Sequence, residues 1–136
     1  MSTPDTTTTT TAPAGTGVDS ATLAVVTAFN DAFNTRSVAA VEPLLTEDCV
    51  FDGTTPPDGE RHTGVDAVRE AFAGVFAGSA AGTFTTEETI VAGERAVVRW
   101  RYDWVGHDGR PGHVRGVDVL TVRHGRIAEK LSYVKG

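Results

Sequence analysis

The amino-acid sequence predicts an α+β domain in which three N-terminal helices pack on one face of a curved antiparallel sheet. Between Ser20 and Phe76, hydrophobic residues recur at the three- and four-residue spacing of amphipathic helices. From Thr83 onward the spacing changes to two, and β-branched and aromatic residues form runs that short turn signals separate. Helices that precede the strands, rather than alternating with them, are typical of the α+β class.

The chain of 136 residues is long enough for one domain with its own core. Residues 1–17 are mostly Thr, Pro, Ala and Gly, so we expect a disordered tail there and a single domain over residues 18–136. The tail lacks the basic start and the apolar stretch of a secretory signal, and no later run approaches the roughly 18 apolar residues of a membrane span. We therefore expect a cytoplasmic protein.

The first helix is expected over residues 20–34, with Asp19 or Ser20 as its cap. A shorter helix is expected after Ser37, which can cap it, and Pro43 should kink it or end it early because proline lacks a backbone donor. The apolar face of the first helix is formed by Val25, Val26, Phe29, Ala32 and Phe33.

A brief extended piece is expected over residues 49–51, followed by a long loop over residues 52–64 that is rich in Pro and Gly. Thr63 or Gly64 should open the third helix, which the sequence GSAAG ends. Four antiparallel strands in a meander are then expected over residues 83–92, 95–105, 113–122 and 126–134.

The closing segment of the chain resembles a known family. Val117–Leu120 followed by His124–Ile127 is similar to the ending common in SnoaL-like polyketide cyclases and their relatives, which include ketosteroid isomerases. With the order of elements, this resemblance implies the cone-shaped fold of the nuclear transport factor 2-like superfamily over about residues 20–136. It is specific for fold and not for activity, because this fold hosts enzymes, ligand binders and assembly modules.

The resemblance implies a pocket inside the cone, and strand parity predicts its lining. Asp118 is one acid within an apolar strand pattern, and if it faces inward then Leu120 does too. Alignment with the family also turns Lys130 and Ser132 inward. The bulky inner side chains of the neighbouring strand are Val98, Trp100, Tyr102 and Trp104.

Asp118 has a chemical role available at this place. In ketosteroid isomerases the matching position is a protonated Asp that donates a hydrogen bond to an oxyanion, and in SnoaL-like cyclases a pocket Asp is the acid/base. The alternative is structural: Asp118 forms an ion pair with Lys130 or a hydrogen bond with Tyr102 and only fills the cavity. Trp100 and Trp104 also have two possible roles: they line the ligand pocket, or they are part of the hydrophobic core.

Two departures narrow the chemistry that the resemblance implies. Ketosteroid isomerases carry a Tyr where this chain has Phe29, and their base position falls at Gly53, beside Asp52. The Asp-Arg-Asp set of limonene-type epoxide hydrolases aligns with Trp100, Tyr102 and Ser132, which excludes that reaction.

A cyclase- or isomerase-like proton transfer on a small hydrophobic carbonyl substrate remains. In it Asp118 is the acid/base or electrophile, Tyr102 is a hydrogen-bond donor, and His62 or Asp52 at the pocket mouth is a second proton carrier. His62 is alternatively a solvent-exposed loop residue. The competing hypothesis is a non-catalytic module for ligand binding or dimerisation.

Cofactors and metals are not expected. The sequence has no P-loop, dinucleotide fingerprint or zinc-type cysteine pair, and the hairpin with His107, Asp108 and His113 lacks a fourth metal ligand. Cys49, the single cysteine, is expected to be a buried and inert thiol.

The net charge of −6 argues against nucleic acid and anionic membranes as partners. The outer face of the sheet is either a basic stripe for an acidic partner or, as the resemblance favours, the rim of a homodimer interface around Val117, Val119 and Thr121. Its arginines are Arg99, Arg101, Arg115 and Arg123, with Asp103 and Glu129 as the expected ion-pair partners.

Overall fold

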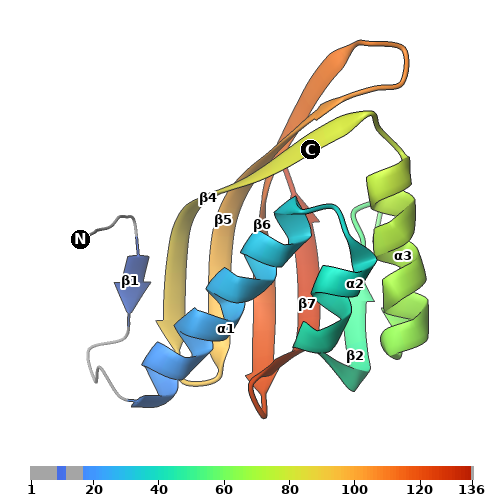
Figure 1. Ribbon diagram of the computed structural model, residues 1–136. Coiled ribbons are helices and arrows are strands. Elements are labelled where there is room, and N and C mark those ends of the chain that lie inside the picture. Colours follow the sequence, from blue (N-terminus) through green and yellow to red (C-terminus); the bar gives the residue numbers. More distant parts are fainter. Residues whose placement is uncertain (1–8, 12–16, 136) are drawn as a thin grey trace.

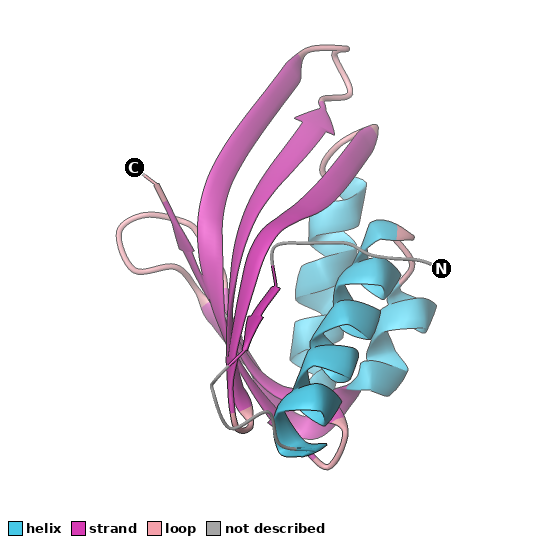
Figure 2. Ribbon diagram, turned by 90° about the vertical axis from the view of Figure 1, so that its left-hand side faces the viewer, coloured by secondary structure: helices cyan, strands magenta, loops and turns pink. Residues whose placement is uncertain are grey.

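The computed structural model describes residues 9–11 and 17–135 and has two layers, with helices on one face of a single curved sheet (Figures 1 and 2). The strand order is β1-β4-β5-β6-β7-β2-β3. The helices are α1 (Gly17–Asn34), α2 (Val38–Val41), the 3₁₀ turn η1 (Glu42–Leu44) and α3 (Val65–Ala77). The strands are β1 (Thr9–Thr11), β2 (Leu45–Asp52), β3 (Arg61–Thr63), β4 (Ala81–Ala92), β5 (Arg95–Val105), β6 (Pro111–Arg123) and β7 (Arg126–Val134).

The start of α1 differs from the sequence prediction. The helix begins at Gly17, so Asp19 lies in its first turn instead of capping it. Asp19 Oδ1 accepts a hydrogen bond from the backbone N–H of Gly93 at 2.7 Å, and Thr22 Oγ1 donates to the Gly93 carbonyl at 2.7 Å. The two side chains therefore hold the turn between β4 and β5 against α1.

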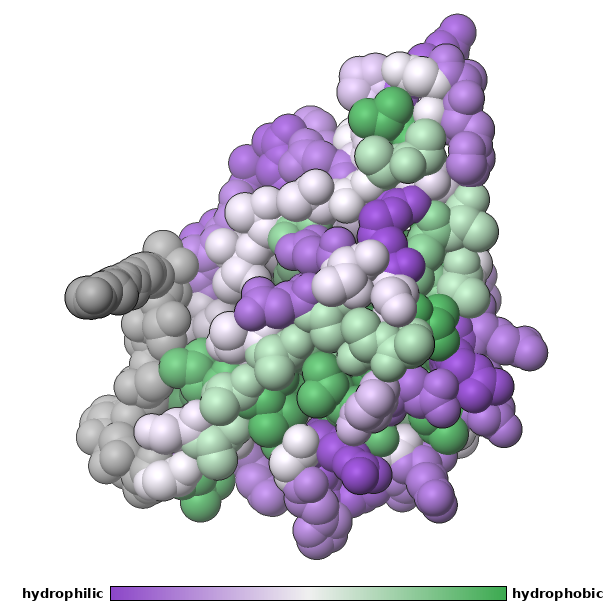
Figure 3. Space-filling model, in the orientation of Figure 1, coloured by the Kyte–Doolittle hydropathy of each residue, from purple (hydrophilic) through white to green (hydrophobic). Residues whose placement is uncertain are grey.

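The two later helices follow their predicted signals. Ser37 caps α2, since its Oγ accepts a hydrogen bond from Ala40 N at 3.3 Å. Pro43 lies in η1, and the helix ends there as expected. Gly64 precedes α3 with φ +91°, a backbone conformation that favours glycine. Exposed positions of α1 include Ala21, Ala24 and Ala28, and Figure 3 shows a pale green band where this helix crosses the view.

The predicted meander is confirmed in β4 to β7, but the sheet is mixed and not wholly antiparallel. The expected extended piece over residues 49–51 is part of the longer β2, which runs parallel to β7. The chain between β2 and β7 is long enough for the crossover that parallel neighbours need. Within the loop expected over residues 52–64, Arg61–Thr63 form β3 and pair antiparallel with β2.

A further strand, β1, lies within the segment expected to be a disordered tail. Thr9–Thr11 pair in parallel with β4, in register from Thr9 opposite Thr89 to Thr11 opposite Val91. The edge of β4 offers free backbone groups, and β-branched threonines suit an extended partner. The other tail residues, 1–8 and 12–16, lie outside the described part of the chain.

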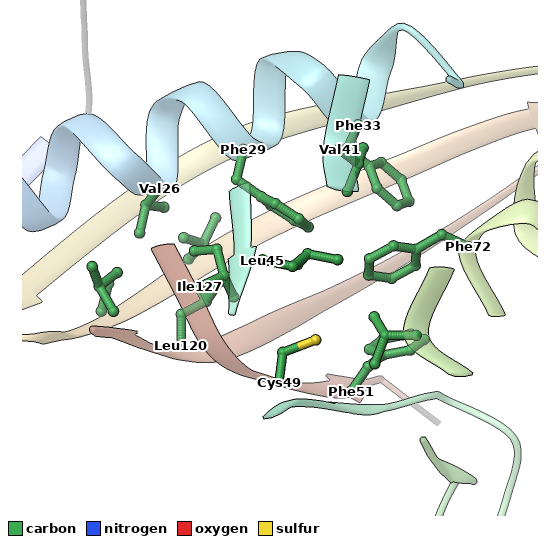
Figure 4. Packing of buried hydrophobic residues seen from close by; sticks show 14 of the residues in the cluster. Val26, Phe29, Phe33, Val41, Leu45, Cys49, Phe51, Phe72, Leu120 and Ile127 are labelled. Atoms are coloured by element: carbon green, nitrogen blue, oxygen red, sulfur yellow. The ribbon is translucent and has the colours of Figure 1, made fainter. Parts of the chain in front are cut away.

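Phenyl rings fill the space between the helices and the sheet. Phe29 and Phe33 on α1 point toward Phe72 on α3 (Figure 4), with ring centroids 6.0 and 5.6 Å from that of Phe72. Phe51 of β2 joins them at 4.8 Å from Phe72. Cys49 is buried in the same cluster, and burial is the main reason why the pKa of its thiol is raised to about 11. The expected buried thiol is confirmed.

Glycines on the neighbouring strands make room for the large aromatic residues of β5. A Cβ at Gly116 would lie 2.9 Å from Trp100 Cζ2, and one at Gly112 would lie 2.5 Å from Trp104 Cζ2. Both glycines stand directly opposite these tryptophans in the β5–β6 register. The sheet can therefore carry indole rings on its concave face, because the partner strand leaves their space free.

We expect Gly116→Ala to destabilise the protein by about 1–3 kcal/mol, because the new methyl group would also lie 2.3 Å from the carbonyl oxygen of Tyr133. Urea unfolding followed by circular dichroism measures the change. Gly74→Ala is the control: it lies within α3 with nothing within 4 Å, so it should stabilise by about 0.5–1 kcal/mol. Equal stability of Gly116→Ala and wild type would contradict the packing described.

Candidate functional site

The alternation predicted for β6 is present. Gly116, Asp118 and Leu120 are buried on the face toward the helices, whereas Val117 and Val119 are half-buried on the opposite face. Asp118 stands directly opposite Ser132 in the β6–β7 pairing, and Leu120 stands opposite Lys130. The register therefore brings three polar side chains together on the inner face.

These three side chains form a polar cluster, defined here as Asp118, Lys130 and Ser132. Ser132 Oγ donates a hydrogen bond to Asp118 Oδ1 at 2.7 Å and accepts one from Lys130 Nζ at 3.0 Å. Lys130 Nζ also lies 3.0 Å from Asp118 Oδ2, an ion pair that lacks the alignment of a hydrogen bond. Asp118 is 1% exposed and Lys130 is 7% exposed. An ion pair this deep is costly to desolvate, so it is a poor choice for stability alone.

Aromatic rings surround the ammonium group of the polar cluster. Lys130 Nζ lies 5.0 Å from the ring centroid of Phe51 and 5.9 Å from that of Phe33. Both are cation–π distances. Five surface hollows among the described residues have linings that do not include Asp118. One of about 460 Å³, between the β2–β3 loop and the end of β7, is lined by Ser132.

The aromatic residues of β5 carry two polar atoms that the described residues leave without a hydrogen-bond partner. These are Trp100 Nε1 and Tyr102 Oη, and both are buried. Trp104 is half-buried and its ring stacks on that of Tyr102 with centroids 6.2 Å apart. Leu120, expected on the inner face, and Phe29, which aligns with the Tyr of ketosteroid isomerases, are 0% and 1% exposed and lie in the hydrophobic core cluster.

Arg36 is a residue that the sequence reasoning missed. Its Nη2 donates to the carbonyl oxygens of Phe76 and Ser79, at the C-terminal end of α3. A Cβ at Gly82 would lie 2.6 Å from Arg36 Nη1 and 2.1 Å from Tyr102 Oη, so both polar atoms lie beside this glycine. The available signal was a single basic residue just after the first helix, in a stretch otherwise free of charge from residue 32 to 41.

The two residues expected at the pocket mouth have partners outside the polar cluster. Asp52 forms a two-pronged ion pair with Arg61, at 2.7 and 2.9 Å, and this hydrogen bonding lowers the pKa of the Asp52 carboxyl. His62 lies in β3 and is half-buried, with its ring stacked on Phe51 at 5.8 Å between centroids. Neither forms a hydrogen bond or ion pair with Asp118.

The arginines of the outer face are held by acids, though not by all of those expected. Arg101 pairs with Asp103 as predicted, and this lowers the pKa of the Asp103 carboxyl. Glu129 instead accepts a hydrogen bond from Thr121. The remaining pairs are Arg99 with Glu87 and Glu88, Arg115 with Glu87, and Arg123 with Asp48.

The β5–β6 hairpin binds the end of α3 through its histidine. His107 Nε2 lies 2.8 Å from the carbonyl oxygen of Ala77, and Asp108 pairs with Arg110. Within residues 17–135 we find no cluster of three or more His, Cys, Asp or Glu side chains suited to a metal ion.

Helices packed on one face of a single curved, mixed sheet have the architecture of the nuclear transport factor 2-like class. The model of the SnoaL-like domain matches residues 26–130, and the chain belongs to this family. The resemblance predicted from the closing segment is thereby confirmed. No curated protein matches the sequence.

Solved structures agree on the fold. A nuclear transport factor 2-like protein of unknown function from Mesorhizobium loti is 39% identical, with 93% of this chain and 99% of that chain covered and a TM-score of 0.78. A proposed SnoaL-like polyketide cyclase from Jannaschia sp. is 15% identical over 88% and 89% of the two chains, with a TM-score of 0.75. TerC, co-crystallised with polyporic acid, is 16% identical over 85% and 92%, with a TM-score of 0.72.

Among the described residues, no helix combines the length and the apolar character needed to cross a bilayer.

Lys130→Met should lower the free energy of unfolding by about 3–5 kcal/mol, because it leaves the buried Asp118 carboxylate without its cation. The double variant Asp118→Asn with Lys130→Met removes both charges and should recover much of the loss. Lys135→Met, at an exposed position, is the control and should change little. Urea unfolding measures all three. A Lys130→Met protein as stable as wild type would mean that the cluster holds no ionised pair.

Proposed function

We propose that the protein binds a small hydrophobic molecule inside its cone. The observation that carries the proposal is the set of polar groups buried among aromatic rings: an ion pair, and two polar atoms without a partner among the described residues. Each unpartnered buried donor costs about 1–3 kcal/mol, and such groups are explained by a ligand or an ordered water that completes them. A fold neighbour, TerC, has been crystallised with polyporic acid.

The proposal extends to a cofactor-independent proton transfer of the cyclase or isomerase kind. Asp118 is the acid/base, Tyr102 donates a hydrogen bond to the reacting oxygen, and His62 is a second proton carrier at the mouth. Because Lys130 and Ser132 engage both oxygens of Asp118, the carboxylate acts only after the substrate has displaced one of them. The residues proposed to contact the ligand are Trp100, Trp104, Leu120, Lys130, Ser132, Asp52 and Phe29.

A specific observation favours a second candidate, a non-catalytic module of the same fold. Asp118 is enclosed, with both carboxylate oxygens engaged within the protein and phenyl rings over its partner Lys130. A filled interior of this kind suits a protein that acts through its surface. The two candidates differ in whether the interior opens to a ligand.

A thermal-shift panel of aromatic polyketides, steroids and cyclic ketones tests the proposal on wild type and Asp118→Asn. A ligand that binds only the folded state raises the melting temperature. At a ligand concentration of a hundred times the Kd, it raises the free energy of unfolding by about 2.7 kcal/mol. We expect Asp118→Asn to fold and to lose turnover of any compound that wild type converts. Unchanged turnover would remove Asp118 from catalysis, and a panel without a hit would favour the module.

We also propose a homodimer through the outer face of the sheet. Val117, Val119 and Leu131 are only half-buried there, and Tyr133 is 57% exposed. Apolar side chains at the centre of a rim of paired charges are typical of an interface.

Val119→Asp should convert the dimer to a monomer in sedimentation velocity, because it places a charge at the centre of this face. Val75→Asp is the control, since Val75 is exposed on α3 in the other layer and should leave the dimer intact. A monomeric wild type, or a dimer that Val119→Asp does not affect, would overturn the proposal.

A further inference from the structure

The cone contains a group of hydrogen-bond donors of which the proposed proton transfer uses only the hydroxyl of Tyr102. We define the donor strip as Arg36, Tyr102 and Trp100. Trp100 and Tyr102 are two residues apart on the inner face of β5, which places them about 6.6 Å apart along the strand. Arg36 Nη1 and Tyr102 Oη both lie beside Gly82.

The polar groups of the donor strip all act as hydrogen-bond donors. An indole N–H and a guanidinium can only donate, and a tyrosine hydroxyl donates wherever an acceptor is available. Trp100 Nε1 and Tyr102 Oη are buried without a partner among the described residues. Any group that satisfies them together must therefore present acceptor oxygens.

The charge of the strip is also uncompensated. Lys130, the other cation in the interior, is neutralised by Asp118 at 3.0 Å. Within the described part of the chain, Arg36 forms no ion pair, and its acceptors are the neutral oxygens of Phe76 and Ser79. The partial negative charge at the C-terminal end of α3 also faces the Arg36 guanidinium. An anionic oxygen is thus favoured at the Arg36 end of the cone and not at the polar cluster.

The surroundings of the strip are flat and aromatic. The ring of Phe33 lies 6.4 Å from that of Tyr102, and the ring of Phe84 lies 5.4 Å from that of Trp100, between centroids. A hollow of about 210 Å³ at the ends of β4 and β5 is lined by Gly82 and Trp104 and so borders the strip. These rings contact each other and give the strip an apolar environment, in which a hydrogen bond to an anionic oxygen is stronger than it is in water.

We infer that the donor strip binds the anionic oxygen of a planar aromatic acid, a carboxylate or phenolate, whose ring lies among these aromatic residues. The inference rests on the proposed function, because it requires the cone to accept a hydrophobic molecule. It adds the charge and the orientation of that molecule. The acid oxygen lies at Arg36, Tyr102 and Trp100, and the ring extends toward the polar cluster.

Isothermal titration of wild type with 2-naphthoate and with 2-ethylnaphthalene tests the inference, since the two probes share a ring system and differ in the anionic group. Wild type should bind 2-naphthoate at least about tenfold more tightly. Tyr102→Phe removes only the unpartnered hydroxyl, so its melting temperature should not fall, whereas its affinity for 2-naphthoate should fall at least about tenfold and its affinity for 2-ethylnaphthalene should not change. Tyr133→Phe, on the outer face, is the matched control and should bind both probes like wild type.

The outcomes separate the two proposals. If wild type binds neither probe, both the hydrophobic site and the donor strip are overturned. If the two probes bind equally and Tyr102→Phe changes neither affinity, the hydrophobic site stands and the donor strip is overturned. A loss of 2-naphthoate binding in Tyr133→Phe as well would place the acid on the outer face and also overturn the inference.

Discussion

The pairing register of β6 with β7 is the constraint on which the interior depends. It sets Asp118 opposite Ser132 and Leu120 opposite Lys130, and so brings one acid, one base and one hydroxyl to the same point of the concave face. Side chains alternate along a strand, so a slip of β7 by one residue would turn Lys130 and Ser132 outward and leave Asp118 on the inner face without them. The buried ion pair of Asp118 and Lys130 therefore favours this register, because a slip by one residue would separate the two charges and leave a buried charge without its partner.

The same concave face combines two kinds of polar group in different states. At the polar cluster, each charged side chain meets its complement within the protein. Near the top of β5, by contrast, donors outnumber acceptors, and two buried polar atoms remain without a partner in the described chain. The interior thus has a neutralised end and an electropositive end. This difference in charge between the two ends would orient a hydrophobic molecule that carries one polar group. It adds less to the affinity, because the hydrophobic contact is similar whichever end the polar group faces.

Much of this arrangement was predictable from the sequence. The change of hydrophobic period at Thr83 predicts the meander, and one acid in an apolar strand is sufficient to assign the faces of β6. Three features were not predictable from local patterns. Two of them are strand pairings: β2 lies parallel to β7, and Thr9–Thr11 pair with β4. Both join segments that are far apart in the sequence, so no local pattern encodes them. Arg36 reaches the interior because of where α3 ends, which no spacing in the sequence encodes.

The hydrogen bonds from α1 to Gly93 bear on how the chain folds. Asp19 and Thr22 are synthesised early, but their partner follows 74 and 71 residues later. Until Gly93 has been made, α1 lacks the backbone groups to which Asp19 and Thr22 bind. Closing so long a loop costs entropy before any contact repays it. The first helix therefore docks only when the β4–β5 hairpin has formed, although it is among the first parts of the chain to be made.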